Sequence, residues 1–217
     1  MNKIIRKIQY SEKVYRFDVE APLIAKSRKA GNFVIIRVDA NSERMPLTIA
    51  DADIEKGTIT LVVQKVGLSS TKLCNLNEGD EIHDVVGPLG NPTHIENFGT
   101  VLCAGGGVGV APMLPIIKAL KAAGNRVLSV IAGRSKDLVI MEDEVRASSD
   151  ELIIMTDDGS YGEKGVVTIG MEKLIQQEHI DKAFAIGPPI MMKFCCLLTQ
   201  KYNLPTDVSL NTIMEDR

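Results

Sequence analysis

A glycine-rich turn between an apolar strand and an apolar helix constrains the fold of this chain more than any other segment. In VLCAGGGVGVAPMLP, residues 101–115, glycines stand at positions 105, 106, 107 and 109. Because glycine has no Cβ, such a backbone can approach a phosphate closely, and the helix beginning near Ala111 directs unpaired N–H groups toward the same place. Pro112 suits the first helical turn, where its missing N–H costs nothing. The segment predicts a phosphate-binding turn, although a tight strand-to-helix turn would need the same glycines. The motif is also not the common G-x-G-x-x-G fingerprint, because Pro112 replaces its last glycine.

The pattern of apolar and polar residues changes near residue 98. After it, apolar strands such as TVLCAG and RVLSVIAG alternate with helical stretches such as PMLPIIKALKAAG. This alternation is typical of a parallel sheet covered by helices on both faces. Before it, short alternating runs rich in β-branched residues, such as VYRFDVEAP and TITLVVQKV, favour an antiparallel barrel. We therefore predict an all-β Greek-key barrel over residues 1–97 and an α/β doubly wound parallel-sheet domain over residues 98–217.

Composition narrows the classes of function. The 217 residues are 45% hydrophobic and 24% charged, typical of a globular protein with one large or two small domains. A net charge of −3 and an aromatic content of 4% argue against nucleic-acid binding and against an acidic membrane as a partner. No apolar run approaches the roughly 18 residues that span a bilayer, and the N-terminus lacks a signal-peptide core. We expect a cytoplasmic protein.

The cysteines and histidines predict no metal site and no catalytic side chain. None of the four cysteines forms a C-x-x-C pair, and two adjacent cysteines on a helix would point in different directions. We expect four reduced, mostly buried thiols at Cys74, Cys103, Cys195 and Cys196. The histidines lie in turn-like or surface contexts without a nucleophile or carboxylate signature; they are His83, His94 and His179.

Three segments of the first half offer ligand chemistry. Arg44-Met45-Pro46-Leu47-Thr48 places a cation and a hydroxyl on a predicted strand. Lys65–Thr71, KVGLSST, supplies a glycine and three hydroxyls just before a predicted helix, and Gly87–Pro92, GPLGNP, is a rigid turn. The first two could hold a phosphate. Each also has a purely structural interpretation: a strand with a surface arginine, hydroxyls that cap the following helix, or a plain turn.

Taken in order along the chain, these segments resemble the ferredoxin–NADP reductase superfamily. The resemblance covers essentially the whole chain and is most specific for the electron-transfer subunit branch. That branch includes the dihydroorotate dehydrogenase electron-transfer subunits and the alpha subunit of NADH-dependent ferredoxin–NADP reductase, also known as a sulfide dehydrogenase subunit. The supporting motifs are PLTIAD at 46–51, TDDGSYG at 156–162, GVVT at 165–168, GPPIMM at 187–192 and VSLN at 208–211.

The resemblance implies a flavin-binding barrel followed by a domain that binds a nicotinamide dinucleotide. Beside the flavin ring it implies Pro46, Leu47 and Thr48, and at the flavin pyrophosphate it implies Gly67, Ser69, Ser70 and Thr71. Facing NAD(P)H it implies Gly106, Gly107, Val108, Gly109, Asp157, Asp158, Gly159, Gly187 and Pro188. The family motif R-x-Y-S/T has arginine three residues before the hydroxyl, where this chain has Met45. Arg44, one residue earlier, remains a candidate for the flavin phosphate, and Leu47 replaces the tyrosine.

The sequence indicates only weakly whether the dinucleotide is NAD or NADP. The predicted strand RVLSVIAG is followed by Arg134, with Ser135 and Lys136 after it. An acidic residue there would bind the ribose hydroxyls of NAD, whereas a cation suits the 2′-phosphate of NADP. Arg134 slightly favours NADP, but NADH-using members of the branch favour the opposite, and both remain open.

The resemblance also implies an iron–sulfur cluster under one condition. Members of the branch continue after S-L-N with a cysteine-rich tail that ligates a [2Fe–2S] cluster, whereas this sequence ends at Met214–Arg217. Such a cluster needs four thiolates, and no four cysteines here are suitably arranged. We expect [2Fe–2S] only if the native chain continues past Arg217.

The function implied is that of a flavoprotein oxidoreductase subunit. It would pass a hydride between NAD(P)H and FAD and send electrons to an iron–sulfur centre, a ferredoxin or a partner flavoprotein. Members of the branch pair with a dihydroorotate dehydrogenase catalytic subunit or with a glutamate-synthase-like flavoprotein, so a hetero-oligomer is expected. The alternatives are a non-catalytic flavin- or nucleotide-binding relay or regulatory subunit, and a stand-alone flavin reductase.

Overall fold

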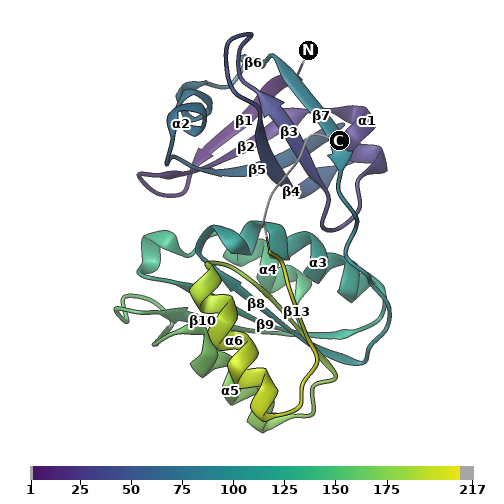
Figure 1. Cartoon of the computed structure of the whole chain (residues 1–217), viewed down its shortest axis with the longest axis vertical. Helices are drawn as coiled ribbons and strands as arrows, with labels where there is room; N and C mark the ends of the chain where they lie inside the picture. Colours follow the sequence, from purple (N-terminus) through teal and green to yellow (C-terminus); the bar gives the residue numbers. More distant parts are fainter. Residues whose placement is uncertain (1, 211–217) are drawn as a thin grey trace. The chain divides into compact units, whose positions relative to one another are not determined.

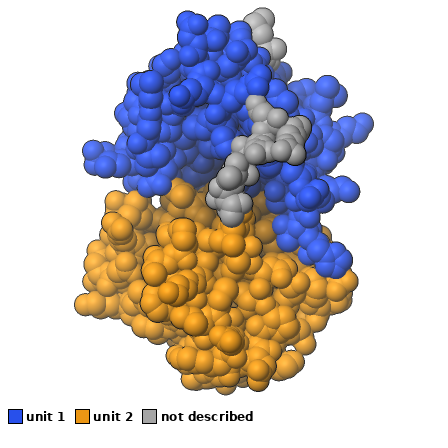
Figure 2. All heavy atoms as spheres, in the orientation of Figure 1, with its two compact units in different colours: residues 1–94 blue, residues 95–217 orange. Residues whose placement is uncertain are grey.

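The computed structural model describes residues 2–210 and divides the chain into two compact units, residues 1–94 and 95–217 (Figures 1 and 2). The first unit is antiparallel. Its elements are β1 (Asn2–Gln9), β2 (Val14–Glu20), α1 (Pro22–Ser27), β3 (Phe33–Arg37), β4 (Met45–Asp53), β5 (Thr58–Gln64), α2 (Leu68–Asn75), β6 (Glu81–Ile82) and β7 (Asp84–Leu89).

The sheet of the first unit curls until its two edges are joined by consecutive residues. The strand order is β6-β1-β2-β5-β4-β3-β7. At one edge Ile82 of β6 pairs with Asn2 of β1, and at the other Asp84 of β7 pairs with Arg37 of β3. Because only His83 separates β6 from β7, one short stretch of chain covers both edges. The predicted antiparallel barrel is thereby confirmed.

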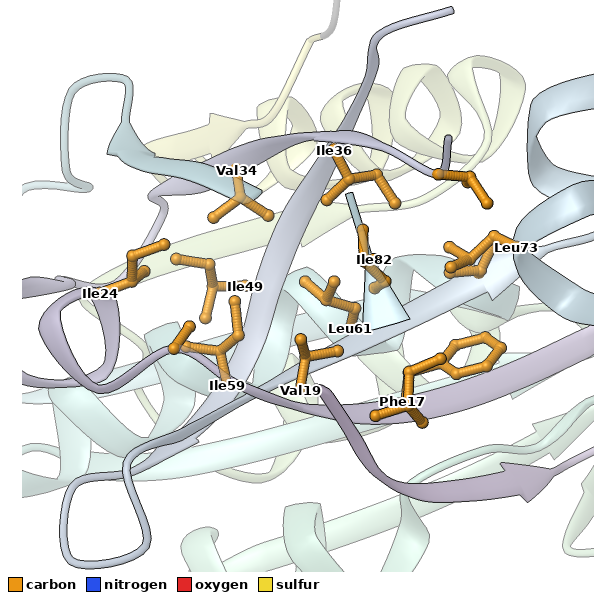
Figure 3. Close-up of a cluster of buried hydrophobic side chains, with 14 of the residues drawn as sticks. Phe17, Val19, Ile24, Val34, Ile36, Ile49, Ile59, Leu61, Leu73 and Ile82 are labelled. Atoms are coloured by element: carbon orange, nitrogen blue, oxygen red, sulfur yellow. The ribbon is translucent and has the colours of Figure 1, made fainter. Parts of the chain in front are cut away.

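The interior of this barrel is filled by alternate residues of its strands. Phe17 and Val19 of β2 and Ile59 and Leu61 of β5 are completely buried, as two-residue periodicity requires when one face of a sheet meets a core. Figure 3 shows these side chains meeting others of the same cluster from β3, β4, β6 and α2. Those labelled partners are Val34, Ile36, Ile49, Ile82 and Leu73.

The second unit is a wholly parallel sheet between helices. Its strands run in the order β11-β10-β9-β8-β12-β13. Helices α3 and α4 lie on one face, and α5 and α6 lie together on the other (Figure 1). The elements are β8 (Thr100–Gly106), α3 (Val110–Ala122), β9 (Arg126–Gly133), α4 (Glu142–Ser148), β10 (Glu151–Thr156), β11 (Glu163–Lys164), α5 (Val167–Gln177), β12 (Lys182–Ile186), α6 (Pro189–Lys201) and β13 (Thr206–Val208), with 3-10 turns η1 (Gly107–Gly109) and η2 (Lys136–Leu138). The predicted doubly wound domain is confirmed.

The winding direction of this sheet reverses between β8 and β12. From β8 the chain builds outward through β9 and β10, then returns to place β12 on the other side of β8. At such a reversal the connecting helices leave on opposite faces and a crevice opens at the carboxyl ends of the two strands. The pairing of Ile186 with Gly105 brings the glycine turn after β8 beside the turn after β12.

A buried asparagine fixes the entry of the chain into β8. Asn125, only 3% exposed, follows α3. Its Oδ1 accepts the N–H groups of Phe98 at 2.7 Å and Gly99 at 3.2 Å. Its Nδ2 donates to the carbonyls of Glu96 and Leu120, both at 2.8 Å. One side-chain amide thus bonds four backbone groups, three of them in the segment before β8 and one in α3.

Among residues 2–210, no helix is both long enough and apolar enough to cross a membrane.

Replacement of Asn125 by alanine is expected to destabilise the second unit strongly. The change removes the side-chain hydrogen bonds to the Phe98 N–H and the Glu96 carbonyl, whereas the Gly99 N–H keeps Asn97 Oδ1 and the Leu120 carbonyl keeps the backbone N–H of residue 125. We expect a loss of about 2–4 kcal/mol in the free energy of unfolding. Urea unfolding followed by circular dichroism measures it. Gln176→Ala, at an exposed position of α5, serves as the control and should change stability by less than about 0.5 kcal/mol. Equal stability of the two variants would contradict this role of the amide.

Candidate functional site

The residues predicted to face a nucleotide gather at one edge of the parallel sheet. Strands β8, β9, β10 and β12 end at Gly106, Gly133, Thr156 and Ile186. Because these strands are parallel, the loops that follow them emerge at the same edge. Those loops carry the predicted residues Gly107, Val108, Gly109, Arg134, Asp157, Asp158, Gly159, Gly187 and Pro188.

Three of the glycines allow two turns of this edge to pack directly on each other. A Cβ on Gly109 would lie 2.5 Å from the carbonyl oxygen of Ile186 and 2.7 Å from the Cα of Gly187. A Cβ on Gly106 would collide with the sulfur of Met191, and one on Gly187 would lie 2.7 Å from the Cε of Met191. Of the three, Gly109 is required by backbone contact between the β8–α3 and β12–α6 turns, whereas a Cβ on Gly106 or Gly187 would meet the flexible end of the Met191 side chain. That is the structural interpretation which the sequence had left open.

Gly107 is different, because its surroundings are open. Its φ of +55° lies in the left-handed region that favours glycine, and a Cβ there would meet no atom within 4 Å. The next residue, Val108, is 36% exposed. Helix α3 begins two residues later, but the N–H of its first residue, Val110, already donates to the Gly107 carbonyl, and Pro112 has no N–H. The backbone at Gly107 and Val108 is nevertheless accessible to an anionic ligand.

The loops after β9 and β10 are joined by backbone hydrogen bonds. Asp157 N–H donates to the carbonyl of Gly133 at 3.1 Å, and Asp158 N–H donates to that of Arg134 at 3.2 Å. The side chains of Arg134, Asp157 and Asp158 are exposed. Hydrogen bonds from Ser160 lower the pKa of Asp158 below its ordinary value. A cation and two carboxyl-bearing residues thus share one rim of the sheet edge.

Thr156 shapes the T-D-D-G-S-Y-G segment from within. Its hydroxyl donates to the carbonyl of Tyr161 at 2.6 Å and accepts the N–H of Tyr161 at 3.1 Å. This closes a compact loop whose tip carries Asp157 to Gly159 into solvent. The TDDGSYG segment therefore owes the shape of its loop to the hydrogen bonds of the buried Thr156.

A small cluster behind Arg134 was not predicted. The Nζ of Lys136 lies 5.3 Å from the centre of the Tyr161 ring, and the Tyr161 hydroxyl donates to Glu142 at 3.2 Å. That hydrogen bond raises the pKa of Tyr161 above its ordinary value. Lys136 N–H also donates to Ser160 Oγ at 2.9 Å. The signal in the sequence was that Lys136 and Tyr161 each follow a strand of one parallel sheet, so their loops had to be neighbours.

In the barrel, the predicted strand residues fall on two faces of β4. Met45 and Leu47 pack against the core cluster, so Pro46 and Thr48 lie on the opposite face. All four are half-buried, and Arg44 is exposed in the loop before the strand. The structure therefore does not bring Pro46, Leu47 and Thr48 to a single face.

The turn after β5 distinguishes the hydroxyls that sequence reasoning treated alike. Ser70, 6% exposed, accepts the N–H groups of Val66 at 3.1 Å and Gly67 at 2.9 Å, and donates to the Gly67 carbonyl at 3.1 Å. Its hydroxyl is committed to holding the turn that begins α2. Ser69 and Thr71 are half-exposed. Of the three predicted hydroxyls, Ser70 fits the capping interpretation and the other two remain accessible to a ligand.

A hollow of about 670 Å³ opens beside this turn. Gly67 and Thr71 line it, together with two cations, Lys13 and Lys65. A Cβ on Gly67 would meet no atom within 4 Å, so there is free space beside this glycine, although its N–H already donates to Ser70. The remaining walls come from the β1–β2 hairpin and from apolar side chains, namely Gln9, Glu12, Tyr15, Val66 and Leu68.

Most of the thiols are buried, and the described residues contain no His, Cys, Asp or Glu cluster that could hold a metal. All four cysteines are free, and only Cys196 is more than slightly exposed. Burial raises the pKa of Cys195 to about 12, and a thiol reacts as its thiolate. His179 lies 3.3 Å from Asp181 at an exposed site.

Comparison with curated proteins shows close relatives along the whole chain. The dihydroorotate dehydrogenase B (NAD(+)) electron transfer subunit homolog of Thermotoga maritima is 49% identical over 216 residues, covering 100% of this chain and 76% of the relative. The dihydroorotate dehydrogenase B (NAD(+)) electron transfer subunit of Fusobacterium nucleatum is 31% identical over 194 residues, covering 86% and 74%. No family model matches the chain.

Solved structures agree with these relatives. A structure of an NADH-dependent reduced ferredoxin–NADP oxidoreductase superposes with a TM-score of 0.94 at 46% identity, over 100% of this chain and 78% of that one. The cytochrome b5 reductase domain of Ulva prolifera nitrate reductase has a TM-score of 0.75 at 19% identity and covers 96% of both chains. The latter likeness concerns the fold alone. The chain belongs to the family of dihydroorotate dehydrogenase B electron-transfer subunits, with a ferredoxin reductase-like fold, as the sequence motifs had indicated.

Proposed function

We propose that this chain is the electron-transfer subunit of an oxidoreductase, with FAD on the barrel and a nicotinamide dinucleotide on the α/β unit. The observation that carries the proposal is the open backbone at Gly107 and Val108, at the reversal point of a parallel sheet, in a chain similar over its full length to electron-transfer subunits. Nucleotides bind at such reversal points in open α/β sheets.

In the α/β unit the proposed nucleotide site uses both the turn and its neighbours. The N–H groups near Gly107 and Val108, with the start of α3, would hold the pyrophosphate. Gly106, Gly109, Gly187 and Pro188 would shape the crevice, because their packing keeps side-chain atoms out of it. Arg134 and the exposed loop of Asp157, Asp158 and Gly159 would meet the ribose end.

On the barrel the proposed flavin site uses the turn before α2 and the start of β4. Gly67, Ser69 and Thr71 line or flank an open hollow that carries Lys13 and Lys65, a setting suited to a pyrophosphate. Ser70 would act indirectly, by holding that turn. Arg44 would assist the phosphate, and Pro46, Leu47 and Thr48 would lie beside the flavin ring from the two faces of β4.

The chemistry requires little acid–base work from side chains. FAD, when bound, supplies acceptance of a hydride from the nicotinamide and release of electrons one at a time to a partner. The protein has to bind and orient the two cofactors. The partner is proposed to be a catalytic or flavoprotein subunit, because the relatives are named as electron transfer subunits.

The first test is the visible absorption spectrum of the purified chain incubated with FAD. We expect a bound flavin band that bleaches on anaerobic addition of NADH, and bleaching without turnover of a physiological substrate until a partner is added. A protein that binds no FAD under any reconstitution condition would contradict the proposal. Rapid catalytic reduction of free flavin without a partner would favour a stand-alone flavin reductase, and a bound flavin that NADH does not bleach would favour a non-catalytic relay.

A second test separates Thr71 from Ser70. Thr71→Ala is expected to weaken FAD binding about 5- to 10-fold, the value of one hydrogen bond, with unchanged unfolding. Ser70→Ala is expected to cost about 1–2 kcal/mol of stability in the barrel, because the N–H groups of Val66 and Gly67 lose their acceptor. Fluorescence titration with FAD and urea unfolding measure the two effects. Identical effects of the two variants would refute the division of roles.

A third test concerns the dinucleotide. The names of the relatives specify NAD(+) or NADH, and we propose NADH as the donor. Whatever activity exists with NADPH should depend on Arg134, the exposed cation beside Asp157 and Asp158. For Arg134→Ala we expect kcat/KM for NADPH to fall about 10-fold and that for NADH to change less than about 3-fold. Lys136→Ala is the comparison, because Tyr161 holds that amine. Equal losses with both nucleotides would reject phosphate discrimination by Arg134.

A further inference from the structure

Helix α6 carries a stripe of exposed apolar side chains. Ile190, Phe194 and Leu197 are 60%, 53% and 45% exposed. Their spacing of four and three residues places them on one face of the helix. We call these three residues the α6 stripe.

The α6 stripe lies on a different face of the helix from the residues that pack against the sheet. Met192, Cys195 and Leu198 are buried against the core of the second unit. The helix is therefore apolar on its inner and outer faces. An outer helix of a domain normally presents polar residues to water.

The neighbouring helix α5 shows that normal pattern. Its inner face buries Val167, Met171 and Leu174, and its last two turns present Lys173, Gln176 and Gln177 to solvent. Both helices lie on the same face of the same sheet (Figure 1). Helix α5 exposes one large apolar residue, Ile169 in its first turn, whereas α6 exposes three along one face. A contiguous exposed apolar surface rimmed by polar residues marks a protein contact.

The charge around the stripe indicates the kind of partner. Helix α6 contains no carboxylate, and its only charged side chains are Lys193 and Lys201. Both are exposed, and neither forms an ion pair with another residue of the range 2–210. From the adjoining helix α5, Glu172 accepts the hydroxyl of Tyr202 at the end of α6, so the cations are contributed by α6 itself. The complementary surface is apolar with carboxylates at its rim.

We propose that the α6 stripe, flanked by Lys193 and Lys201, is a docking surface for the partner subunit of the enzyme, on an apolar patch rimmed by acidic residues. This rests on the proposed function, which requires a partner. A second copy of the chain fits less well, because an α6–α6 contact would bring together lysines without any carboxylate on the helix. A lipid surface also fits less well, since two lysines contribute only about 1 kcal/mol each.

The position of the stripe relates it to the nucleotide edge. Ile190 is three residues beyond Gly187, and the adjacent Met191 contacts the positions of Gly106 and Gly187. One helix therefore touches the glycine turn with one side chain and presents the stripe with its neighbours. A partner docked on α6 would lie next to the proposed nicotinamide site.

The experiment measures binding to purified candidate partners by isothermal titration calorimetry. The probes are the dihydroorotate dehydrogenase catalytic subunit and the glutamate-synthase-like flavoprotein from the same genome, each with the FAD-loaded chain. We expect one of them to bind the wild type, and Phe194→Glu to weaken that binding about 30-fold or more. Lys193→Glu should weaken it about 5-fold and reduce its salt dependence. Ile54→Glu is the matched control, because Ile54 is an exposed apolar residue, 66% accessible, in the barrel unit.

Several results would overturn the proposal. They are failure of both probes to bind the wild type, equal binding by Phe194→Glu and wild type, or an equal loss in Ile54→Glu. Self-association that Phe194→Glu abolishes, seen by sedimentation, would assign the stripe to a second copy, and flotation with phosphatidylserine vesicles would assign it to lipid.

Reduction of the bound flavin by NADH is measured on the same samples and separates the two proposals. Phe194→Glu should bleach as fast as wild type, because the stripe touches neither cofactor site. If NADH bleaches the flavin normally and Phe194→Glu binds the partner as tightly as the wild type, only the docking surface is refuted. A chain that binds its partner through Phe194 but whose flavin NADH does not reduce refutes only the proposed function.

Discussion

The second unit depends on the direct contact between the β8–α3 turn and the β12–α6 turn. With a Cβ at Gly109 only 2.5 Å from the Ile186 carbonyl, any larger residue would force the two turns apart. This contact sets how close the two turns at the reversal point lie, and with Met191 it fixes α6 against the glycine turn. Two residues before Gly109, a Cβ on Gly107 would meet no atom within 4 Å. The same glycine turn thus combines a tight backbone contact at Gly109 with open space at Gly107.

The sequence predicted the two folds correctly, and the structure changes the interpretation of some of the residues in them. Two-residue and helical periodicity were sufficient for the barrel and the doubly wound sheet, because burial of one face imposes both patterns. The glycine cluster was interpreted as a phosphate-binding turn, yet within it only Gly107 has open space beside it. A Cβ on Gly106 would meet Met191 and one on Gly109 would meet Ile186, both from distant parts of the chain. Such contacts join residues far apart in sequence, so no local pattern contains them.

The same limit explains the residues that sequence reasoning grouped together or missed. Alternation along β4 already implied that Leu47 and Thr48 point to opposite faces, which a motif read as a unit conceals. Ser70 could not be separated from Thr71, because the direction of a hydroxyl at a helix start depends on the turn before it. Lys136 and Tyr161 meet only because β9 and β10 pair in parallel and end together. Strand order supplies that information, and composition does not.

Helix α6 shows why exposure has to be seen in three dimensions. In sequence, PIMMKFCCLLTQK is an apolar segment of the kind that fills a core, and nothing in it distinguishes Met192 from Phe194. Packing against one face of a sheet can bury only one side of a helix, so a segment apolar all round leaves half of its apolar surface in water. That surface has an unfavourable hydration free energy in the isolated chain. Among the helices on this face of the sheet, only α6 combines this cost with cations that lack partners among residues 2–210. Burial of Phe194 against an acidic, apolar surface would remove the cost and pair the cations in one step.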